Sequence, residues 1–182
     1  KHVLCEKPFA LSAAQAASMA ALAKDRGVTA MVAHEFRHAP QRAQVWELLE
    51  QGAIGTPQIV SAELFLGRPA PATPPPASWS SRASEGGGFL GALGSHYIDG
   101  LRHWFGDVAS VSGTLLTLRP ERSEGGAVVM ADTDDSFSIT LTFRSGVVAT
   151  MVASSAVSPS QGARITIAGS DGVFVLTQRS PN

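Results

Sequence analysis

The hydrophobic pattern of this 182-residue chain changes near Thr56, and that change limits which folds are possible. Before this point, two short apolar runs, His2–Cys5 and Val28–Ala33, flank an alanine-rich stretch. A strand, a helix and a strand joined by short connections are typical of a parallel sheet covered on both faces. After Thr56 the apolar residues alternate with polar ones, as they do in strands that bury one face. The chain is therefore expected to combine two architectures.

The helices of the first part are marked by end signals. Ser12 and Gln15 form a capping box before the alanine-rich stretch, and Gly27 suits the left-handed conformation that ends a helix. A second helix is expected to begin at Pro40, because proline suits the first helical position, and to stop near Gly52. This order of elements is that of the last units of a doubly wound sheet.

The second part contains the clearest strand of the chain, Ser136–Phe143. Its apolar side chains alternate without a break with serine and threonine, which predicts a strand with one buried face. Further strands are expected at Gln58–Leu66, Val108–Leu118, Val147–Ser154, Arg164–Ala168 and Val173–Thr177. Small residues at Ser145-Gly146 and at Ser170-Asp171-Gly172 predict hairpin turns between pairs of these strands. The second part is therefore predicted to be an open, mostly antiparallel sheet.

Two stretches interrupt the strand pattern. Arg68–Pro76 is rich in proline and alanine and is predicted to be an extended surface loop. Glu121–Ala127 is rich in glutamate, serine and glycine and is predicted to be a mobile hairpin loop. Neither stretch carries residues typical of a catalytic site.

Composition excludes several classes of partner. The formal net charge is −1 and the pI is about 6.6, which gives no electrostatic reason to expect nucleic acid or an anionic membrane. No apolar stretch approaches the ~20 residues of a membrane-spanning helix. Cys5 is the single cysteine, so a disulfide framework within the chain is excluded, as suits a reducing compartment such as the cytoplasm. A small neutral or anionic metabolite fits better as a partner.

Two segments carry residues suited to chemistry. Cys5-Glu6-Lys7-Pro8 follows the first apolar run, and its proline stops the strand, so the lysine lies at the strand's carboxyl end, where open α/β sheets bind ligands. Gly86–Asp99 begins with three glycines and leads into a helical pattern that contains His96. The apolar residues of that helix fall on one face, so His96 is expected to point away from the packing face.

Together these segments resemble the glucose-fructose oxidoreductase, inositol dehydrogenase and MocA family of nicotinamide-dependent sugar and cyclitol dehydrogenases. Arg37-His38-Ala39-Pro40 and Gly52-Ala53-Ile54-Gly55, which lie between the two segments, fit the same family. The resemblance implies an α/β plus α+β fold, with residues 1–55 as the end of a Rossmann dinucleotide-binding domain. Residues 56–182 would then form an open, mostly antiparallel sheet domain with helices on one face. Most of the Rossmann domain would lie before Lys1, so we expect a fragment.

The resemblance also implies roles for individual residues. Lys7 and His96 would be catalytic and handle the proton of the reacting hydroxyl, and a partly buried lysine can both release and accept a proton. Glu6, Lys7, Pro8 and Arg37 would contact the cofactor, NAD or NADP, and Arg37 could instead support the junction between domains. The substrate would be a sugar, cyclitol or related polyol. The sheet would form contacts between subunits of a homo-oligomer.

Residue 92 departs from the family pattern. Many members place an aspartate four residues before the histidine, where its carboxylate can orient the imidazole, and this chain has Ala92 there. A carboxylate–histidine pair within this helix is therefore excluded. The proton relay is expected to run through Lys7, His96 and water.

Each candidate residue also has a purely structural interpretation. Lys7 could cap a strand end and pair with Glu6, and His96 could be a buried histidine between helix and sheet. His34 and Glu35 would point to opposite sides of an extended strand end, so a zinc site is not expected. The helix positions His96, Asp99 and His103 are expected to form an ordinary solvated face. Two further candidates for the rim of a pocket are Trp79 and Arg82, although a buried tryptophan anchoring a loop is the simpler explanation.

Gly86-Gly87-Gly88 is not a dinucleotide-binding turn, because no apolar strand precedes it and no acidic residue follows on a second strand. This polypeptide alone is therefore expected to bind NAD or NADP weakly or not at all and to be inactive. The sequence leaves two other functions open. One is a non-catalytic binding or dimerisation module derived from the family, and the other is a glycoside hydrolase that works through a nicotinamide cycle.

Overall fold

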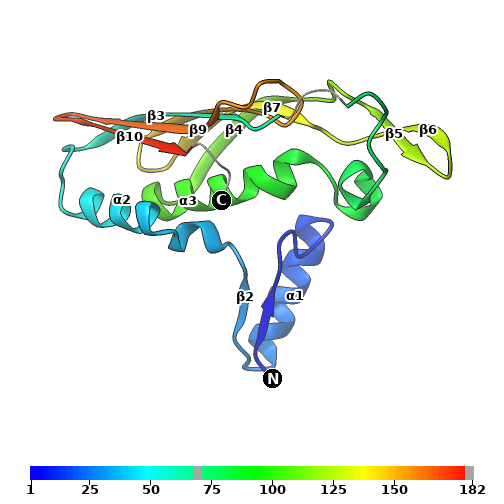
Figure 1. The fold of residues 1–182 in the computed structure, drawn as a ribbon. Coiled ribbons are helices and arrows are strands. Elements are labelled where there is room, and N and C mark those ends of the chain that lie inside the picture. The colour runs from blue at the N-terminus through cyan, green and yellow to red at the C-terminus, as the bar shows by residue number, and fades with distance from the viewer. Residues whose placement is uncertain (68–70, 179–182) are drawn as a thin grey trace.

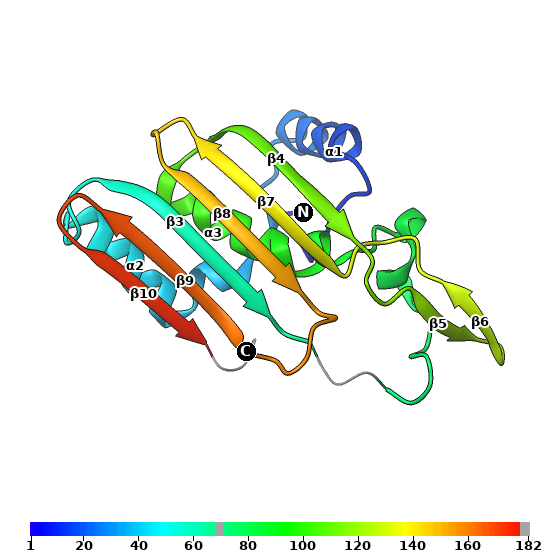
Figure 2. The same cartoon turned by 90° about the horizontal axis from the view of Figure 1, so that it is seen from above.

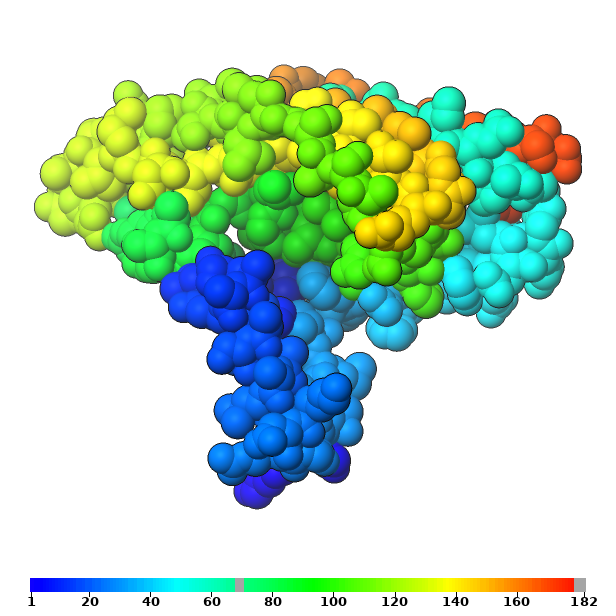
Figure 3. Space-filling view, turned by 180° about the vertical axis from the view of Figure 1, so that it is seen from behind, coloured from blue at the N-terminus to red at the C-terminus, as the bar shows by residue number. Residues whose placement is uncertain are grey.

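The computed structural model describes residues 1–67 and 71–178 and has a larger and a smaller part (Figure 1). The larger part is a six-stranded sheet with helices beneath it. The smaller part contains β1 (Val3–Cys5), α1 (Ala13–Asp25) and β2 (Ala30–Val32), and it projects from the helix side of the larger part (Figures 1 and 3). The predicted combination of α/β and α+β architecture is confirmed.

The smaller part is a parallel strand–helix–strand unit. β1 pairs with β2 in parallel. The hydroxyl of Ser12 accepts a hydrogen bond from the backbone N–H of Gln15 at 3.2 Å, and the side chain of Gln15 accepts one from Leu11 at 2.9 Å. Ser12 is therefore the N-cap as predicted, but the reciprocal bond of a capping box is not formed, because the Gln15 side chain accepts from Leu11 rather than from Ser12. Gly27, which follows the C-cap residue of α1, has a φ of +59° and so ends the helix in the left-handed conformation.

β2 was expected to be covered on both faces, and in this chain that expectation is wrong. Val3, Leu4 and Met31 are 53–71% exposed. The physical reason is that, among the described residues, only β1 pairs with β2 and no side chain of α1 is buried. The smaller part therefore presents apolar side chains on its surface.

The large sheet has the strand order β10-β9-β3-β8-β7-β4, and each neighbouring pair except β3–β8 is antiparallel (Figure 2). Its strands are β3 (Pro57–Phe65), β4 (Val108–Leu116), β7 (Ser136–Phe143), β8 (Val148–Ser154), β9 (Gly162–Gly169) and β10 (Val173–Gln178). The predicted open, mostly antiparallel sheet is confirmed.

Helices cover one face of this sheet (Figure 1). The chain enters them through the 3₁₀ helix η1 (Glu35–His38), which leads into α2 (Pro40–Glu50). Two short 3₁₀ turns, η2 (Trp79–Ser81) and η3 (Ala83–Glu85), precede the π-helical turn η4 (Leu90–Gly94), which runs directly into α3 (Ser95–Phe105). α2 starts at the proline that the sequence indicated.

The core lies between the helices and the sheet. β7 shows the predicted alternation, because Phe137 and Phe143 are 1–2% exposed while Ser138 faces solvent. Val45 of α2 and Ile54 belong to the same buried cluster as the sheet residues. α2 therefore packs on the sheet, although it precedes residue 56.

Glu121–Ala127, predicted to be a mobile hairpin loop, lies in a hairpin, but its arms are regular β-strands, which were not predicted. β5 (Glu121–Glu124) pairs with β6 (Ala127–Met130), and the turn between them is formed by Gly125 and Gly126, with φ values of +58° and +85°. Pro76 bridges to Ser123 of this hairpin. In the predicted loop Arg68–Pro76, residues 68–70 lie outside the described residues.

Candidate active site

Lys7 reaches across from the smaller part to the helices under the sheet. It lies two residues after β1, is partly buried, and donates a hydrogen bond from Nζ to the backbone carbonyl of Ala92 in η4. The two residues are 85 positions apart in sequence. The strand end and the turn that precedes His96 are therefore brought together, as the family resemblance implied.

The three glycines before η4 allow close packing of the chain on itself. A Cβ on Gly87 would lie 2.5 Å from the carbonyl oxygen of Trp79, and Gly88 has a φ of +114°. The side chain of Asp134 accepts a hydrogen bond from the backbone of Leu90 at 2.7 Å, at the start of η4. The glycines follow a 3₁₀ turn rather than a strand, so they anchor the start of this helical segment and do not form a dinucleotide-binding turn.

His96 lies one turn after Ala92 and is 2% exposed. Its ring stacks on Phe36 at a centroid distance of 4.0 Å and meets the edge of His34 at 5.4 Å. His96 lies on a different side of α3 from the residues that pack on the sheet, but η1 covers that side, so the imidazole is buried rather than open to solvent.

Glu35 also reaches His96, although strand alternation placed it opposite His34. Its Oε2 lies 3.8 Å from Nδ1 of His96. The alternation fails because β2 ends at Val32 and the backbone turns into η1 at Glu35. The carboxylate of Glu35 therefore approaches His96 from η1, whereas the family pattern places one within the helix of His96.

The environment of His96 favours its neutral form. Burial and the nearby Lys7 lower its pKa from the ordinary value of 6.5, as do His34 and Arg42, and Glu35 acts in the opposite direction. A neutral imidazole can accept a proton, so the site can hold a base near neutral pH.

This pKa shift predicts how stability depends on pH. The unfolded chain binds a proton at His96 more readily than the folded chain, so the free energy of unfolding should fall as pH drops below about 6.5 and level off below the folded pKa. His96→Asn should remove this contribution. Urea unfolding between pH 7.5 and 4.5 measures it, with the exposed His38→Asn as the control; the same pH slope in wild type and His96→Asn would contradict the prediction.

Arg37 joins η1 to α3. Its guanidinium forms a two-point ion pair with Asp99, with Nε at 2.8 Å from Oδ2 and Nη2 bonded to Oδ1. Asp99 is only 15% exposed, and the ring of His103 stacks on Trp46 at 4.5 Å. The expected solvated face at these helix positions is therefore wrong, because η1 and α2 cover it. Within the described residues, the ion pair of Arg37 links η1 to α3.

A cavity of about 260 Å³ lies beside Lys7, between the end of β1, the start of α1 and the segment that leads into α3. Its polar lining includes Lys7, His34 and Ser95, and its apolar lining includes Pro8 and Phe9. Of the other residues predicted to bind a cofactor, Glu6 and Arg37 do not belong to the described lining.

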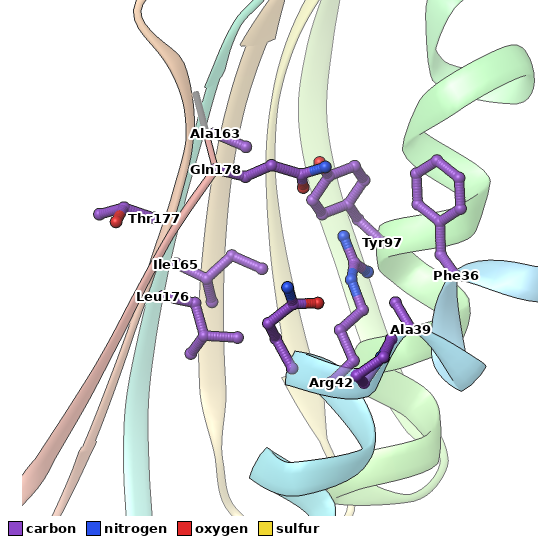
Figure 4. Close-up of a pocket in the computed structure, with 11 residues that line it drawn as sticks. Phe36, Ala39, Arg42, Tyr97, Ala163, Ile165, Leu176, Thr177 and Gln178 are labelled. Carbon is purple, nitrogen blue, oxygen red and sulfur yellow. The ribbon is translucent and has the colours of Figure 1, made fainter. Parts of the chain in front are cut away.

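A second cavity of about 340 Å³ lies between α2, α3 and the end of β10 (Figure 4). Arg42 is buried there, with its guanidinium carbon 4.3 Å from the ring centroid of Tyr97 and 5.2 Å from that of Phe36. Burial lowers the pKa of Arg42. Arg42 thus packs α2 against α3 through its aromatic neighbours.

Trp79 and Arg82 lie before the glycines. Trp79 is 45% exposed, so the explanation as a buried anchor is wrong. Arg82 forms ion pairs with Glu85 and Glu124 and so ties η3 to the β5–β6 hairpin. Over residues 1–67 and 71–178, no three His, Cys, Asp or Glu side chains gather as a metal site would require.

Comparison with known proteins decides the family. Residues 43–175 match the sequence profile described as the GFO/IDH/MocA C-terminal domain. The chain belongs to the GFO/IDH/MocA family. Residues 1–34 match a second profile, described as an oxidoreductase family with an NAD-binding Rossmann fold. This family of NAD-binding oxidoreductases is the one that the lysine and histidine motifs indicated.

Curated members of the GFO/IDH/MocA family include similar dehydrogenases. Levoglucosan dehydrogenase of Pseudarthrobacter phenanthrenivorans is 32% identical over 169 residues, which cover 84% of this chain and 43% of that protein. The scyllo-inositol 2-dehydrogenase (NADP(+)) of Bacillus subtilis is 27% identical over 175 residues, with 96% and 45% covered. The chain spans about half the length of the curated relatives it matches.

Solved structures share the fold over the same extent. Levoglucosan dehydrogenase in complex with NADH and L-sorbose has a TM-score of 0.89 and 30% identity, and the match covers 97% of this chain and 48% of that one. An oxidoreductase domain protein from Kribbella flavida has a TM-score of 0.88 and 32% identity, with 100% and 51% covered. No helix in the described part of the chain is long and apolar enough to cross a membrane.

Proposed function

We propose that the protein carrying this chain is an NAD(P)-dependent oxidoreductase that transfers hydride between the cofactor and a hydroxyl-bearing carbon of a sugar, cyclitol or related polyol. The observation that carries this proposal is the contact of Lys7 with the turn before His96. It brings Lys7, which lines the cavity, to the turn that leads into His96, so two groups able to exchange protons lie near each other. The relatives named as levoglucosan and scyllo-inositol dehydrogenases support the substrate class.

The cavity beside Lys7 fits one part of a nicotinamide cofactor. At about 260 Å³ it is just below the ~300–1,000 Å³ of small-molecule pockets, which gives room for one ring rather than a whole dinucleotide. Its wall of Pro8 and Phe9 suits a flat ring, and Lys7 supplies a polar edge. Lys7 and Pro8 would therefore hold the nicotinamide end, with Glu6 close by and Arg37 supporting the site through Asp99.

The residues of the chain would manage the proton. A bound nicotinamide would supply the acceptor for the hydride, so that the carbon bearing the hydroxyl would become a carbonyl. The hydroxyl must then lose its proton, and the neutral His96 would take it while Lys7 donates a hydrogen bond to the hydroxyl oxygen. In the reverse direction the same groups return the proton to the carbonyl oxygen.

Oligomeric state, compartment, domain division and the activity of the chain alone are also proposed. The solvent-facing side of the large sheet exposes Ile59, Val111 and Val175, so it offers a surface for a homo-oligomer. The exposed free thiol of Cys5 suits the cytoplasm.

The proposed division into residues 1–55 and 56–182 follows the change in sequence pattern, whereas α2 packs with the sheet. The chain alone is proposed to bind NAD or NADP weakly and to be inactive.

A spectrophotometric assay distinguishes the proposed function from its rivals. The intact protein should reduce NAD or NADP with levoglucosan, D-xylose or scyllo-inositol, with a rise in absorbance of the reduced cofactor. Release of a sugar from a glycoside would instead indicate the hydrolase. A binding or dimerisation module, which Ala92 favours because it removes the family's carboxylate, would give neither signal, and that outcome would overturn the proposal.

A further inference from the structure

The Nδ1 atom of His96 is buried and has no hydrogen-bond partner within the described residues. A buried polar atom that loses its partner costs about 1–3 kcal/mol, so buried ring nitrogens are normally paired. Without a partner for Nδ1, nothing fixes which of the two ring nitrogens carries the proton. A histidine that acts as a base needs its proton on one nitrogen, so that the other is free to accept. A partner for Nδ1 is therefore the missing part of this site.

Glu35 is placed to be that partner. Its Oε2 lies 3.8 Å from Nδ1, which is less than 1 Å beyond the ~2.7–3.2 Å of a hydrogen bond. Its side chain is 61% exposed and makes no hydrogen bond with other described residues, so rotation about its own bonds can close the gap. The backbone turn into η1 fixes where this side chain begins.

The other groups around His96 do not offer an alternative carboxylate. Lys7, His34 and Arg42 face it from the end of β1, from the residue before η1 and from α2, and each of them disfavours a positive charge on the ring. Asp99, three residues further along α3, is held by Arg37. Glu35 is thus the one carboxylate acting on His96 among the described groups.

We propose that Glu35 is a positioning residue whose carboxylate accepts a hydrogen bond from Nδ1–H of His96. This fixes the tautomer in which the other ring nitrogen is free to take the substrate's hydroxyl proton. Glu35 supplies from η1 the carboxylate that α3 and its preceding turn lack at Ala92. The inference rests on the proposed function for its role in turnover, whereas the contact with His96 can be tested without activity.

The test compares Glu35→Gln with wild type in the intact protein. Turnover should fall about tenfold, at the low end of the cost of losing a carboxylate that orients a histidine. In the absence of substrate, the NMR titration midpoint of His96 should move to lower pH, because the carboxylate that favours the protonated ring is gone. Glu47→Gln, an exposed glutamate on α2, is the matched control and should change neither.

A second substitution separates positioning from a local structural effect. Ala92→Asp in the Glu35→Gln background places a carboxylate four residues before His96, on the same side of the helix. It should return the titration midpoint toward the wild-type value and recover most of the lost turnover. An unchanged midpoint in Glu35→Gln would overturn the inference even if hydride transfer is observed. Failure of wild type to transfer hydride would overturn the proposed function, and the titration would still decide the contact.

Discussion

Lys7→Met in the intact protein is expected to lower turnover by about 10²–10⁴-fold, which is the usual contribution of a positioned proton-transfer group. Methionine keeps the length of the side chain but cannot donate to the carbonyl of Ala92 or exchange a proton. Cofactor affinity should change much less, because most of a dinucleotide is bound elsewhere in a Rossmann domain. Steady-state kinetics with varied cofactor and polyol measures both effects.

Lys24→Met is the control for this substitution. Lys24 is exposed near the end of α1, so turnover should stay at the wild-type level. Turnover of Lys7→Met equal to that of Lys24→Met would remove Lys7 from the proposed mechanism. A loss confined to cofactor affinity would instead assign Lys7 to binding alone.

Phe137→Ala is expected to lower the free energy of unfolding by about 3–5 kcal/mol, as is usual when a buried aromatic ring is removed from a core. The ring is 1% exposed and packs under η4, where a Cβ on Gly94 would lie 2.8 Å from its Cζ. Phe89, at the start of η4, lies 6.1 Å from it, centroid to centroid. Removal of the Phe137 ring should therefore also loosen η4, which carries the carbonyl of Ala92.

Urea unfolding measures this effect, and Ser138→Ala is its matched control. Ser138 is the next residue of β7, but it faces solvent, so its substitution should change stability by less than about 0.5 kcal/mol. Similar stabilities for the two variants would mean that the buried face of β7 contributes little. A drop in turnover for Phe137→Ala at temperatures where the protein stays folded is also expected.

The architecture could be predicted from the sequence because periodicity and end signals are local. Ser136–Phe143 alternates over its full length, and its bounds match those of β7. The strands β5 and β6 were missed because each is only four residues long, although a hairpin loop was predicted there and Gly125-Gly126 is a typical hairpin turn. The exposure of β2 could not be read from its apolar composition, because burial depends on which elements lie beside a strand.

The candidate site was predicted only in part. The contact between Lys7 and the His96 segment followed from a family resemblance, since no local pattern links positions 85 residues apart. Glu35 was placed on the wrong side because strand alternation was extended past Val32, where β2 ends. The environment of His96 depends on η1 folding back onto α3, which is a tertiary contact.

The partner of Lys7 is a main-chain oxygen, and this has a consequence for sequence divergence. Nearly every amino acid supplies the same carbonyl at residue 92, so mutation of that side chain leaves the lysine's anchor in place. A member of the family could thus exchange an acidic side chain there for alanine in a single event without releasing the lysine. The anchor of Lys7 and the proposed carboxylate partner of His96 therefore depend on different residues, so a substitution at one leaves the other in place.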